Sequence, residues 1–422
     1  MPATAPSPAP PAIPSRSAGR RPGRRLLVCG ILLILVAAVA YAGRLSAMAV
    51  VMDLVGIGLW PGMGGTALCA LAAWRAVGTG LPRRTHVVRW TAAAGGTAVC
   101  LLLARDRFLL YRAEEVRFTS GGARLAGTLY TPRGGGPHPA VVIVHGSGRE
   151  TRDEYAFYAR LFARSGIAAL AYDKRGAGAS TGETYGTDYG GYADDAAAAV
   201  QMLAARPGID PGRMGLMGVS EAEWVAPLAA SRAREIAFLA VVSAAGTSPA
   251  EQVNAEIALR LRGRGYGEAD VRRALALNGR VLEYQRTGRG ADSLRAALRA
   301  AEHEPWFADA EDIPDEIFPF AEYAWWRSVM DFDADAAWAR VTVPVLLLKG
   351  GADPMSPADV MERRVSAALR RGGNGAFRVV VFPGADHGML RWPLREGVPP
   401  PVFAEGYLDT LVSWVREATR PR

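Results

Sequence analysis

A serine in this chain has the neighbours that suit a catalytic nucleophile. Ser220 lies in the run Gly218-Val219-Ser220-Glu221-Ala222, directly after an apolar stretch and directly before a helix-like one. A serine exposed on a tight strand-to-helix turn needs small residues two positions before and two after it, because the turn crowds its neighbours. Gly218 meets this need, and Ala222, although not the commoner glycine, is the smallest alternative. The pattern predicts hydrolysis through an acyl-serine intermediate.

The general base must come from only five histidines. Four of them lie at positions that do not suit a base: His86 between two apolar runs, His138 before the third predicted strand, His145 in the turn after that strand, and His303 in the region 251–340. The fifth, His387, follows the last apolar run of the chain in Pro-Gly-Ala-Asp-His-Gly, and it lies after both the serine and the candidate acids. We therefore predict that His387 takes the proton of the nucleophile as general base.

Two aspartates are candidates for the acid that orients this histidine. Asp353 ends the segment Gly-Gly-Ala-Asp after the apolar run 345–348, and Asp386 directly precedes the histidine. Adjacent residues seldom aim their side chains at each other, so Asp353 is favoured and Asp386 is the alternative. The acid would hold the imidazole tautomer and stabilise the imidazolium. Asp359, at the start of a predicted helix, is interpreted as a solvent-exposed acid.

Short apolar runs alternate with helix-like stretches from residue 113 onward. The runs predict eight strands, of which the first two form an antiparallel pair: 116–119, 125–130, 140–144, 168–172, 214–218, 238–243, 345–348 and 379–382. Helices are predicted near 154–165, 193–205, 221–233, 357–370 and 402–418. Near-continuous apolar strands that alternate with helices are typical of a mostly parallel sheet covered on both faces. The fold class predicted for residues 113–422 is therefore α/β.

Three further runs carry a family resemblance: VIVHGSG at 142–148, DKRGAGASTG at 173–182 and WVAPLAA at 224–230. Together with the serine motif, they make residues 114–419 similar to the bacterial α/β-hydrolase esterases. That group merges into the serine aminopeptidases and the dipeptidyl-peptidase-like hydrolases. The resemblance implies the α/β-hydrolase fold. In that fold the acid stands in the loop after the strand 345–348, where Asp353 lies, and the base stands after the last strand, where His387 lies. It is specific to the superfamily and much less so to a substrate.

The same resemblance implies an oxyanion hole. The family places half of it in the turn after the third strand, and here the backbone N–H groups of Ser147 and Glu221 would face the developing oxyanion. Such donors lower the barrier by several kcal/mol in related enzymes. Gly146 and Gly148 in this turn, and Gly218 before the nucleophile, would allow the close backbone approach. An ordinary glycine-rich turn after a strand is the alternative interpretation.

Residues 251–340 interrupt the alternation of strands and helices. This insert is rich in Arg and Glu, has a helical pattern, and occupies the place where the fold carries a lid. Aromatic residues crowd its end: Trp306, Phe307, Phe318, Phe320, Tyr323, Trp325 and Trp326. Two interpretations are open, namely a small core that belongs to the lid itself and an apolar acyl or aryl pocket over Ser220.

Residues 1–112 differ in composition from the rest of the chain. They carry thirteen arginines and two acidic residues, a net charge of +11, whereas the whole chain has +8, which leaves −3 on residues 113–422. The basic character therefore belongs to the N-terminal region, and this argues against nucleic acid as a partner. Residues 1–25, rich in Pro, Ala, Ser and Arg, are predicted to be a disordered tail.

Three apolar runs within residues 26–112 are each about as long as a membrane-crossing helix: 26–42, 54–74 and 87–104. They predict an all-α transmembrane region, with the lipid bilayer as a partner, ahead of the α/β-hydrolase domain. Pro61 weakens the second span. Buried core helices are one alternative, and a cleavable signal peptide is another for the first run, because residues 40–42 match a small-x-small cleavage pattern.

The arginine distribution predicts an orientation. The tail carries five arginines and the loop between the second and third spans carries four, against one in the first loop. Because cytoplasmic loops hold the excess of basic residues, we expect a multi-pass protein of the cell membrane whose catalytic domain is extracytoplasmic. Arg105, Arg107 and Arg112, after the third span, favour the opposite orientation.

The predicted function is hydrolysis of a carboxylic ester, with a small-molecule ester or acyl compound as substrate. The alternatives are a serine peptidase that acts on short peptides and a non-catalytic membrane receptor or scaffold on a hydrolase fold. No cofactor or metal is predicted, because the three cysteines lack metal-site spacing and the glycine-rich turns lack the Lys-Ser/Thr of a phosphate loop. The sequence makes no prediction of oligomeric state.

Overall fold

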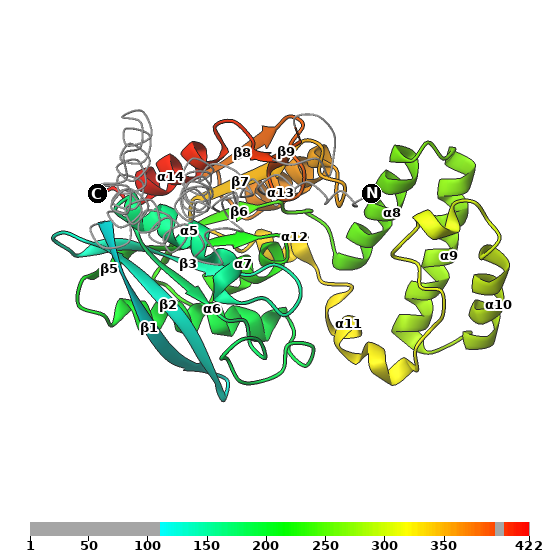
Figure 1. The fold of residues 1–422 in the computed structure, drawn as a ribbon, viewed down its shortest axis with the longest axis horizontal. Helices are drawn as coiled ribbons and strands as arrows, with labels where there is room; N and C mark the ends of the chain where they lie inside the picture. Colours follow the sequence, from blue (N-terminus) through cyan, green and yellow to red (C-terminus); the bar gives the residue numbers. More distant parts are fainter. Residues whose placement is uncertain (1–109, 393–400, 422) are drawn as a thin grey trace, which may run out of the picture. The chain divides into compact units, whose positions relative to one another are not determined.

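The computed structural model describes residues 110–392 and 401–421 (Figure 1). The predicted tail and the three predicted spans lie outside these residues. In the part of the chain that the structure describes, no helix combines the length and the apolar character needed to cross a bilayer. The first strand, β1 (Tyr111–Ser120), begins two residues before position 113, so Tyr111 and Arg112, which were predicted to belong to a membrane region, are part of the sheet.

Eight strands form one sheet in the order β1-β2-β4-β3-β5-β6-β7-β8. Besides β1 they are β2 (Ala123–Pro132), β3 (His138–Val144), β4 (Ala168–Tyr172), β5 (Ile209–Val219), β6 (Ile236–Val242), β7 (Val345–Gly350) and β8 (Phe377–Phe382). The strand β2 pairs antiparallel with β1 and with β4, and the remaining pairs are parallel. The prediction of a mostly parallel sheet is thereby confirmed.

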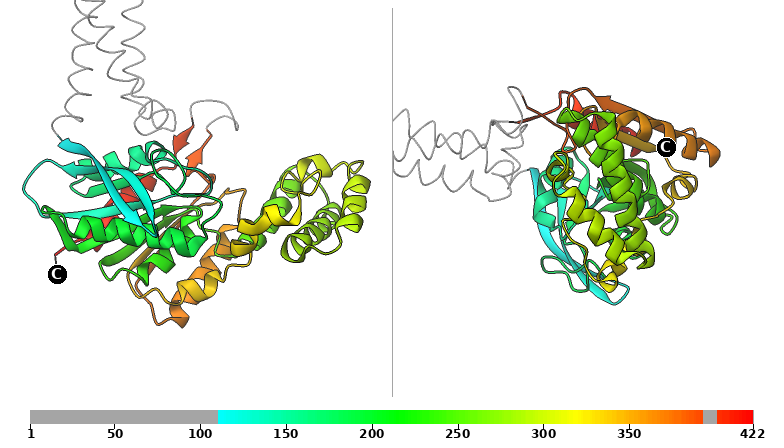
Figure 2. Two further views of the ribbon diagram at one scale, coloured as in Figure 1. Left: turned by 90° about the horizontal axis from the view of Figure 1, so that it is seen from below. Right: turned by 90° about the vertical axis from the view of Figure 1, so that its right-hand side faces the viewer.

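Helices cover both faces of this sheet (Figures 1 and 2). Alternate residues of β3 show why: Val142 and Val144 pack into one hydrophobic cluster, while Val141 and Ile143 pack into another. Because successive side chains of a strand point to opposite faces, a strand buried on both sides must be apolar throughout. The first cluster contains α6 (Tyr189–Ala204), α7 (Ala222–Ala230) and α13 (Ala358–Arg371); the second contains α5 (Arg152–Arg164) and α14 (Tyr407–Ala418).

Several element bounds differ from the sequence-based expectation, and those of β5 and of the last helix have a clear physical reason. The strand β5 begins at Ile209 and not at 214, because its pairing with β3 continues across Pro211-Gly212 through a register shift. The last helix begins at Tyr407 and not at 402. Gly406 has a positive φ of 74°, which no helix continues through, and the residues before it form a small ribbon of β9 (Leu390–Arg391) and β10 (Val402–Phe403).

The insert is helical, as expected. Its elements are α8 (Pro249–Gly263), α9 (Glu268–Thr287), α10 (Ala291–Ala301), η3 (Phe307–Asp309), η4 (Phe320–Tyr323), α11 (Ala324–Val329) and α12 (Ala334–Trp338) (Figure 2). A capping box starts it at α8, where the Ser248 and Glu251 side chains satisfy each other's backbone N–H groups.

The aromatic residues of the insert are divided between different surroundings. Trp306 and Phe307 are buried in a cluster formed by α8, α9, α10 and the segment after them, so these two pack the insert's own core. The Trp325 indole N–H donates to the backbone oxygen of Thr187, which lies outside the insert, at 2.8 Å. Phe318 is 54% exposed to solvent. The interpretation as a lid core therefore holds for Trp306 and Phe307.

Candidate active site

Ser220 stands on a sharp turn between β5 and α7. Its backbone is in the left-handed region, with φ of 54°, a conformation that L-residues adopt only where the surroundings hold it. A Cβ atom at Gly218 would lie 2.3 Å from the Cβ atom of Ala222, which is fully buried. Steric crowding thus explains why small residues flank the serine at both positions.

The structure brings the three predicted catalytic side chains together. The distance from Ser220 Oγ to His387 Nε2 is 3.0 Å, and the distance from His387 Nδ1 to Asp353 Oδ2 is 2.8 Å. The three residues follow β5, β8 and β7, which run parallel, so they meet at one edge of the sheet. This geometry allows the serine hydroxyl to pass its proton to an imidazole that a carboxylate orients.

A glycine allows the acid loop and the histidine loop to approach each other. A Cβ atom at Gly350, the last residue of β7, would lie 2.2 Å from the backbone oxygen of Asp386. In addition, the Ala352 N–H donates to the backbone oxygen of Ala385 at 2.9 Å. The Ser243 hydroxyl donates to the backbone oxygen of His387 at 2.6 Å. These contacts hold the histidine loop against the ends of β6 and β7.

The alternative acid, Asp386, is engaged elsewhere. Its Oδ1 accepts the N–H of Leu390 at 2.8 Å, and its Oδ2 accepts the indole N–H of Trp392 at 3.0 Å. It therefore closes its own loop, while Asp353 contacts the imidazole. Asp359 is 70% exposed and pairs with Arg363, as its position at the start of a helix indicated.

The Asp353 carboxylate is held ionised by its contacts. Burial by itself would raise its pKa, but the hydrogen bond to His387, the charge of that imidazole and the charge of Lys349 lower the pKa below the ordinary value. Lys349 Nζ lies 2.6 Å from Asp353 Oδ2, and both side chains are 0% exposed. The Met355 N–H donates to Oδ1 at 2.9 Å. A carboxylate fixed in this way suits the stabilisation of an imidazolium.

The predicted oxyanion donors lie on the two turns beside the nucleophile. Among the described residues, neither the Ser147 N–H nor the Glu221 N–H donates a hydrogen bond within the protein. Gly146, which precedes the first of them, is buried, and Gly148 has a φ of 95° that requires glycine. The two N–H groups are therefore available to an oxyanion formed on Ser220.

Buried charges that no motif predicted surround these turns. Lys174 and Lys349 are 3% and 0% exposed, and they are the only lysines in the chain, against 47 arginines. Their rarity is the sequence signal that could have marked them. Glu223 is also buried, and its carboxylate accepts the N–H groups of Ala245 and Gly246 at 2.7 Å each. Burial raises the pKa of Glu223 to about 7.

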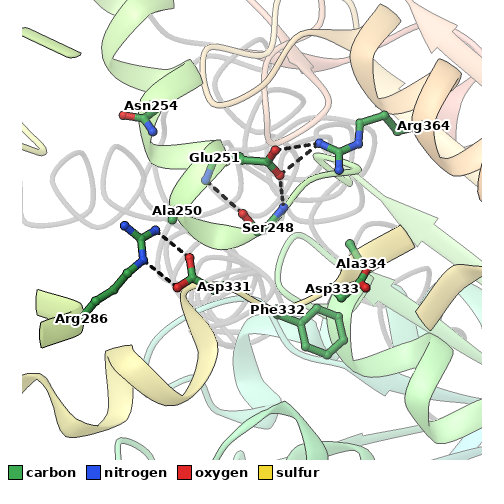
Figure 3. A pocket seen from close by; sticks show the side chains of 10 residues that line it. All are labelled: Ser248, Ala250, Glu251, Asn254, Arg286, Asp331, Phe332, Asp333, Ala334 and Arg364. Atoms are coloured by element: carbon green, nitrogen blue, oxygen red, sulfur yellow. Dashed lines mark hydrogen bonds and ion pairs between the residues drawn. The ribbon is translucent and has the colours of Figure 1, made fainter. Parts of the chain in front are cut away.

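A polar pocket of about 460 Å³ lies at the root of the insert (Figure 3). Two ion pairs line it: Arg286 with Asp331 at 2.6 Å, and Arg364 with Glu251 at 3.0 Å. Four of its charged side chains therefore pair with each other, and the carboxylate of a fifth, Asp333, accepts the Ala336 N–H at the start of α12. Within residues 110–392 and 401–421, no group of three or more His, Cys, Asp or Glu side chains is placed to hold a metal ion.

A mostly parallel sheet that carries a serine on a strand-to-helix turn, an acid after β7 and a histidine after β8 defines an α/β hydrolase. Residues 135–391 match the family model described as serine aminopeptidase, S33, which is more than half of the chain. The chain belongs to this family and is a serine hydrolase by class.

Two curated relatives match parts of the chain. Esterase EstD of Thermotoga maritima is 27% identical over 309 residues, which is 71% of this chain and 65% of EstD. Thiohydrolase aneE of Aspergillus aculeatus is 37% identical over 109 residues, 25% of this chain and 34% of the relative. The chain thus spans less than two thirds of the length of each. The solved carboxylesterase EstE1, cloned from a metagenomic library, has a TM-score of 0.46 at 16% identity and covers 76% of this chain and 94% of its own.

Proposed function

We propose that this chain hydrolyses carboxylic esters of small molecules through an acyl-serine intermediate. The observation that carries the proposal is the continuous hydrogen-bond chain from Ser220 Oγ through the His387 imidazole to Asp353. The family and the name of the relative EstD support it. A non-catalytic receptor or scaffold on the same fold would have no need of this arrangement.

The proposed reaction has two halves. Ser220 Oγ attacks the carbonyl carbon of the ester while its proton passes to His387 Nε2, and the Ser147 and Glu221 N–H groups bind the oxyanion. The imidazolium, stabilised by the Asp353 carboxylate, protonates the departing alcohol, which leaves an acyl-serine. A water molecule then attacks the acyl carbon, with His387 again as base. Collapse of this second intermediate releases the carboxylic acid and restores the serine.

The test uses the full-length protein with a fluorophosphonate probe and a series of p-nitrophenyl esters of increasing acyl length. We expect covalent labelling and ester turnover, both lost in Ser220→Ala. The matched variant is Ser231→Ala at the end of α7, an exposed serine whose hydroxyl donates to the Leu228 backbone oxygen. It should behave as the wild type. Full activity in Ser220→Ala would end the hypothesis.

A peptidase is the second candidate, because the description of the matching family names an aminopeptidase. The acyl-serine mechanism is the same, but the leaving group is an amine. Aminoacyl p-nitroanilides, measured beside p-nitrophenyl esters on one preparation, separate the two functions. A higher kcat/KM on the anilides would replace the ester proposal with the peptidase.

We further propose that the predicted spans within residues 26–110 anchor the protein in the cell membrane, with the hydrolase domain outside the cytoplasm. Three apolar runs of membrane-spanning length and the arginine excess in the tail and second loop support this. Membrane fractions washed with alkaline carbonate should retain the full-length chain. Alkaline phosphatase fused after Leu110 should be active and green fluorescent protein at the same point dark; the reverse pattern would place the domain in the cytoplasm.

A further inference from the structure

Lys174 makes its contacts behind the predicted oxyanion hole. Its Nζ donates to the backbone oxygen of Gly146 at 2.8 Å and lies 2.5 Å from Glu221 Oε1. The ammonium also lies 4.6 Å from the centroid of the Tyr192 ring, a distance at which a cation is attracted to the ring face. The Lys174 and Glu221 side chains are only 4% and 2% exposed. One buried cation thus joins two turns that are far apart in the sequence.

These two turns are those that carry the oxyanion donors. In a planar trans peptide the C=O and the following N–H point in opposite directions. An ammonium that holds the Gly146 oxygen therefore aims the Ser147 N–H away from Lys174. The N–H of Gly146 donates to the Tyr155 hydroxyl at 2.7 Å, so this segment is held at both of its polar groups. The other donor is the N–H of Glu221 itself, whose carboxylate binds the same ammonium.

We propose that the Lys174–Glu221 ion pair is a positioning element that fixes the two halves of the oxyanion hole relative to each other. The proposal rests on the function proposed above. Oxyanion donors act because they are already in place when charge develops, and a misplacement of about 1 Å reduces the rate about 100-fold. Lysine suits the position because it is a compact charge with three donors, whereas arginine presents a planar fork.

A neighbouring ion pair offers a matched control. Arg175, the next residue along the chain, pairs with the buried Asp195 of α6. Its guanidinium also donates to the backbone oxygen of Ser120 in β1 at 3.1 Å. This second pair is buried and starts from the same loop, but its contacts lie on β1 and α6. A general loosening of the loop would therefore follow from either change, whereas misplaced oxyanion donors follow only from loss of the Lys174 pair.

The main variant is the full-length double change Lys174→Met with Glu221→Leu. It removes the ion pair without leaving an unpaired buried charge, and it is therefore compatible with a stable fold. The backbone N–H at position 221, which is one of the two oxyanion donors, is retained. We expect kcat on a p-nitrophenyl ester to fall about 100-fold with KM within about threefold. A trifluoromethyl ketone, whose adduct with the serine carries an oxyanion, should lose affinity by the same factor. Tm should stay near that of the wild type.

The control is Arg175→Met with Asp195→Leu, which should keep kcat and ketone affinity within about threefold. If the main variant does not fold, Glu221→Gln, which preserves the shape of the side chain, replaces it. The same two quantities, kcat and ketone affinity, are then measured. A folded variant with unchanged kcat and ketone affinity overturns the proposal. So does a loss of kcat with unchanged ketone affinity, or an equal loss in the control. Failure of the underlying function differs, because the wild type would then neither turn over esters nor bind the ketone.

Discussion

The ion pairs of the α/β core and those of the helical insert differ in their exposure to solvent. In the α/β core several pairs are buried, with side chains at most 11% exposed: Lys174–Glu221, Lys349–Asp353 and Arg175–Asp195. In the insert many lie on helix surfaces, with the arginine side chain 46–79% exposed: Arg273–Asp270, Arg289–Glu283 and Arg295–Asp292. The two regions use the same chemical pairing in two different dielectric surroundings.

This difference in exposure corresponds to different roles of the ion pairs in the two regions. An exposed pair contributes about 0–1 kcal/mol, because water and salt screen it, yet it keeps a surface helix solvated. Breaking a buried pair leaves a charge without solvent or partner and is strongly destabilising. In the core, that cost fixes side chains beside the nucleophile in one geometry. The insert has its own hydrophobic cluster, and its surface charges are not required to hold a reacting group.

The largest effect is expected for Asp353→Asn. The variant removes the charge that orients His387 and stabilises its imidazolium, so kcat on a p-nitrophenyl ester should fall about 10⁴-fold. The matched change in the insert, Asp331→Asn, removes a 54% exposed carboxylate and should leave kcat within about twofold. In the histidine loop, Asp386→Asn should have far less effect than Asp353→Asn. A loss in Asp386→Asn as large as in Asp353→Asn would reverse the assignment of the acid.

Lys349→Met should reduce the free energy of unfolding by about 3–5 kcal/mol, because it leaves the buried Asp353 carboxylate without its cation. Urea unfolding followed by tryptophan fluorescence measures this. The matched variant in the insert is Arg286→Met, whose pair with Asp331 is partly exposed, and we expect a loss of about 1 kcal/mol or less. Equal losses would show that burial does not separate the two regions.

The buried carboxyl of Glu223 in the core should make the free energy of unfolding depend on pH. Burial raises its pKa from an ordinary 4.5 to about 7 in the folded state. Below pH 4.5 the carboxyl is protonated in both states; between 4.5 and 7 only the unfolded state loses the proton, so stability falls as pH rises, by up to about 3 kcal/mol. Glu223→Gln should remove this fall. Unfolding in urea at pH 4.5, 6 and 8 tests it, and a constant difference between wild type and variant would contradict it.

The smallest effect is expected in the insert. Arg295→Ala on α10 breaks a surface pair with Asp292 that spans three residues of one helix, at 3.1 Å. Pairs of this kind contribute about 0.2–0.5 kcal/mol in helices, and alanine is itself a good helix former. The change in unfolding free energy should therefore stay within about 0.5 kcal/mol and shrink further in 1 M salt. A loss above 2 kcal/mol would mean that surface charge does stabilise the insert.

Local rules were enough to predict the sheet and the nucleophile. The two-faced burial of a central strand demands a continuous apolar run, and such runs are visible in the sequence. The turn at Ser220 demands small residues at positions 218 and 222, which is a requirement on neighbours along the chain. The order of serine, acid and histidine is likewise a property of the sequence. By contrast, the predicted start of β5 at 214 was wrong, because pairing with β3 extends the strand back to Ile209.

Contacts between distant segments were decided only by the tertiary structure. Asp353 and Asp386 both suit the acid from their positions in the sequence, and only the fold turns one toward the imidazole and the other toward Leu390 and Trp392. Lys174 lies 47 residues from Glu221, and no local pattern links them. A sequence determines what each residue requires of its neighbours. Which charges meet in the interior depends on how strands and turns pack, because burial, more than spacing along the chain, makes such a pairing obligatory.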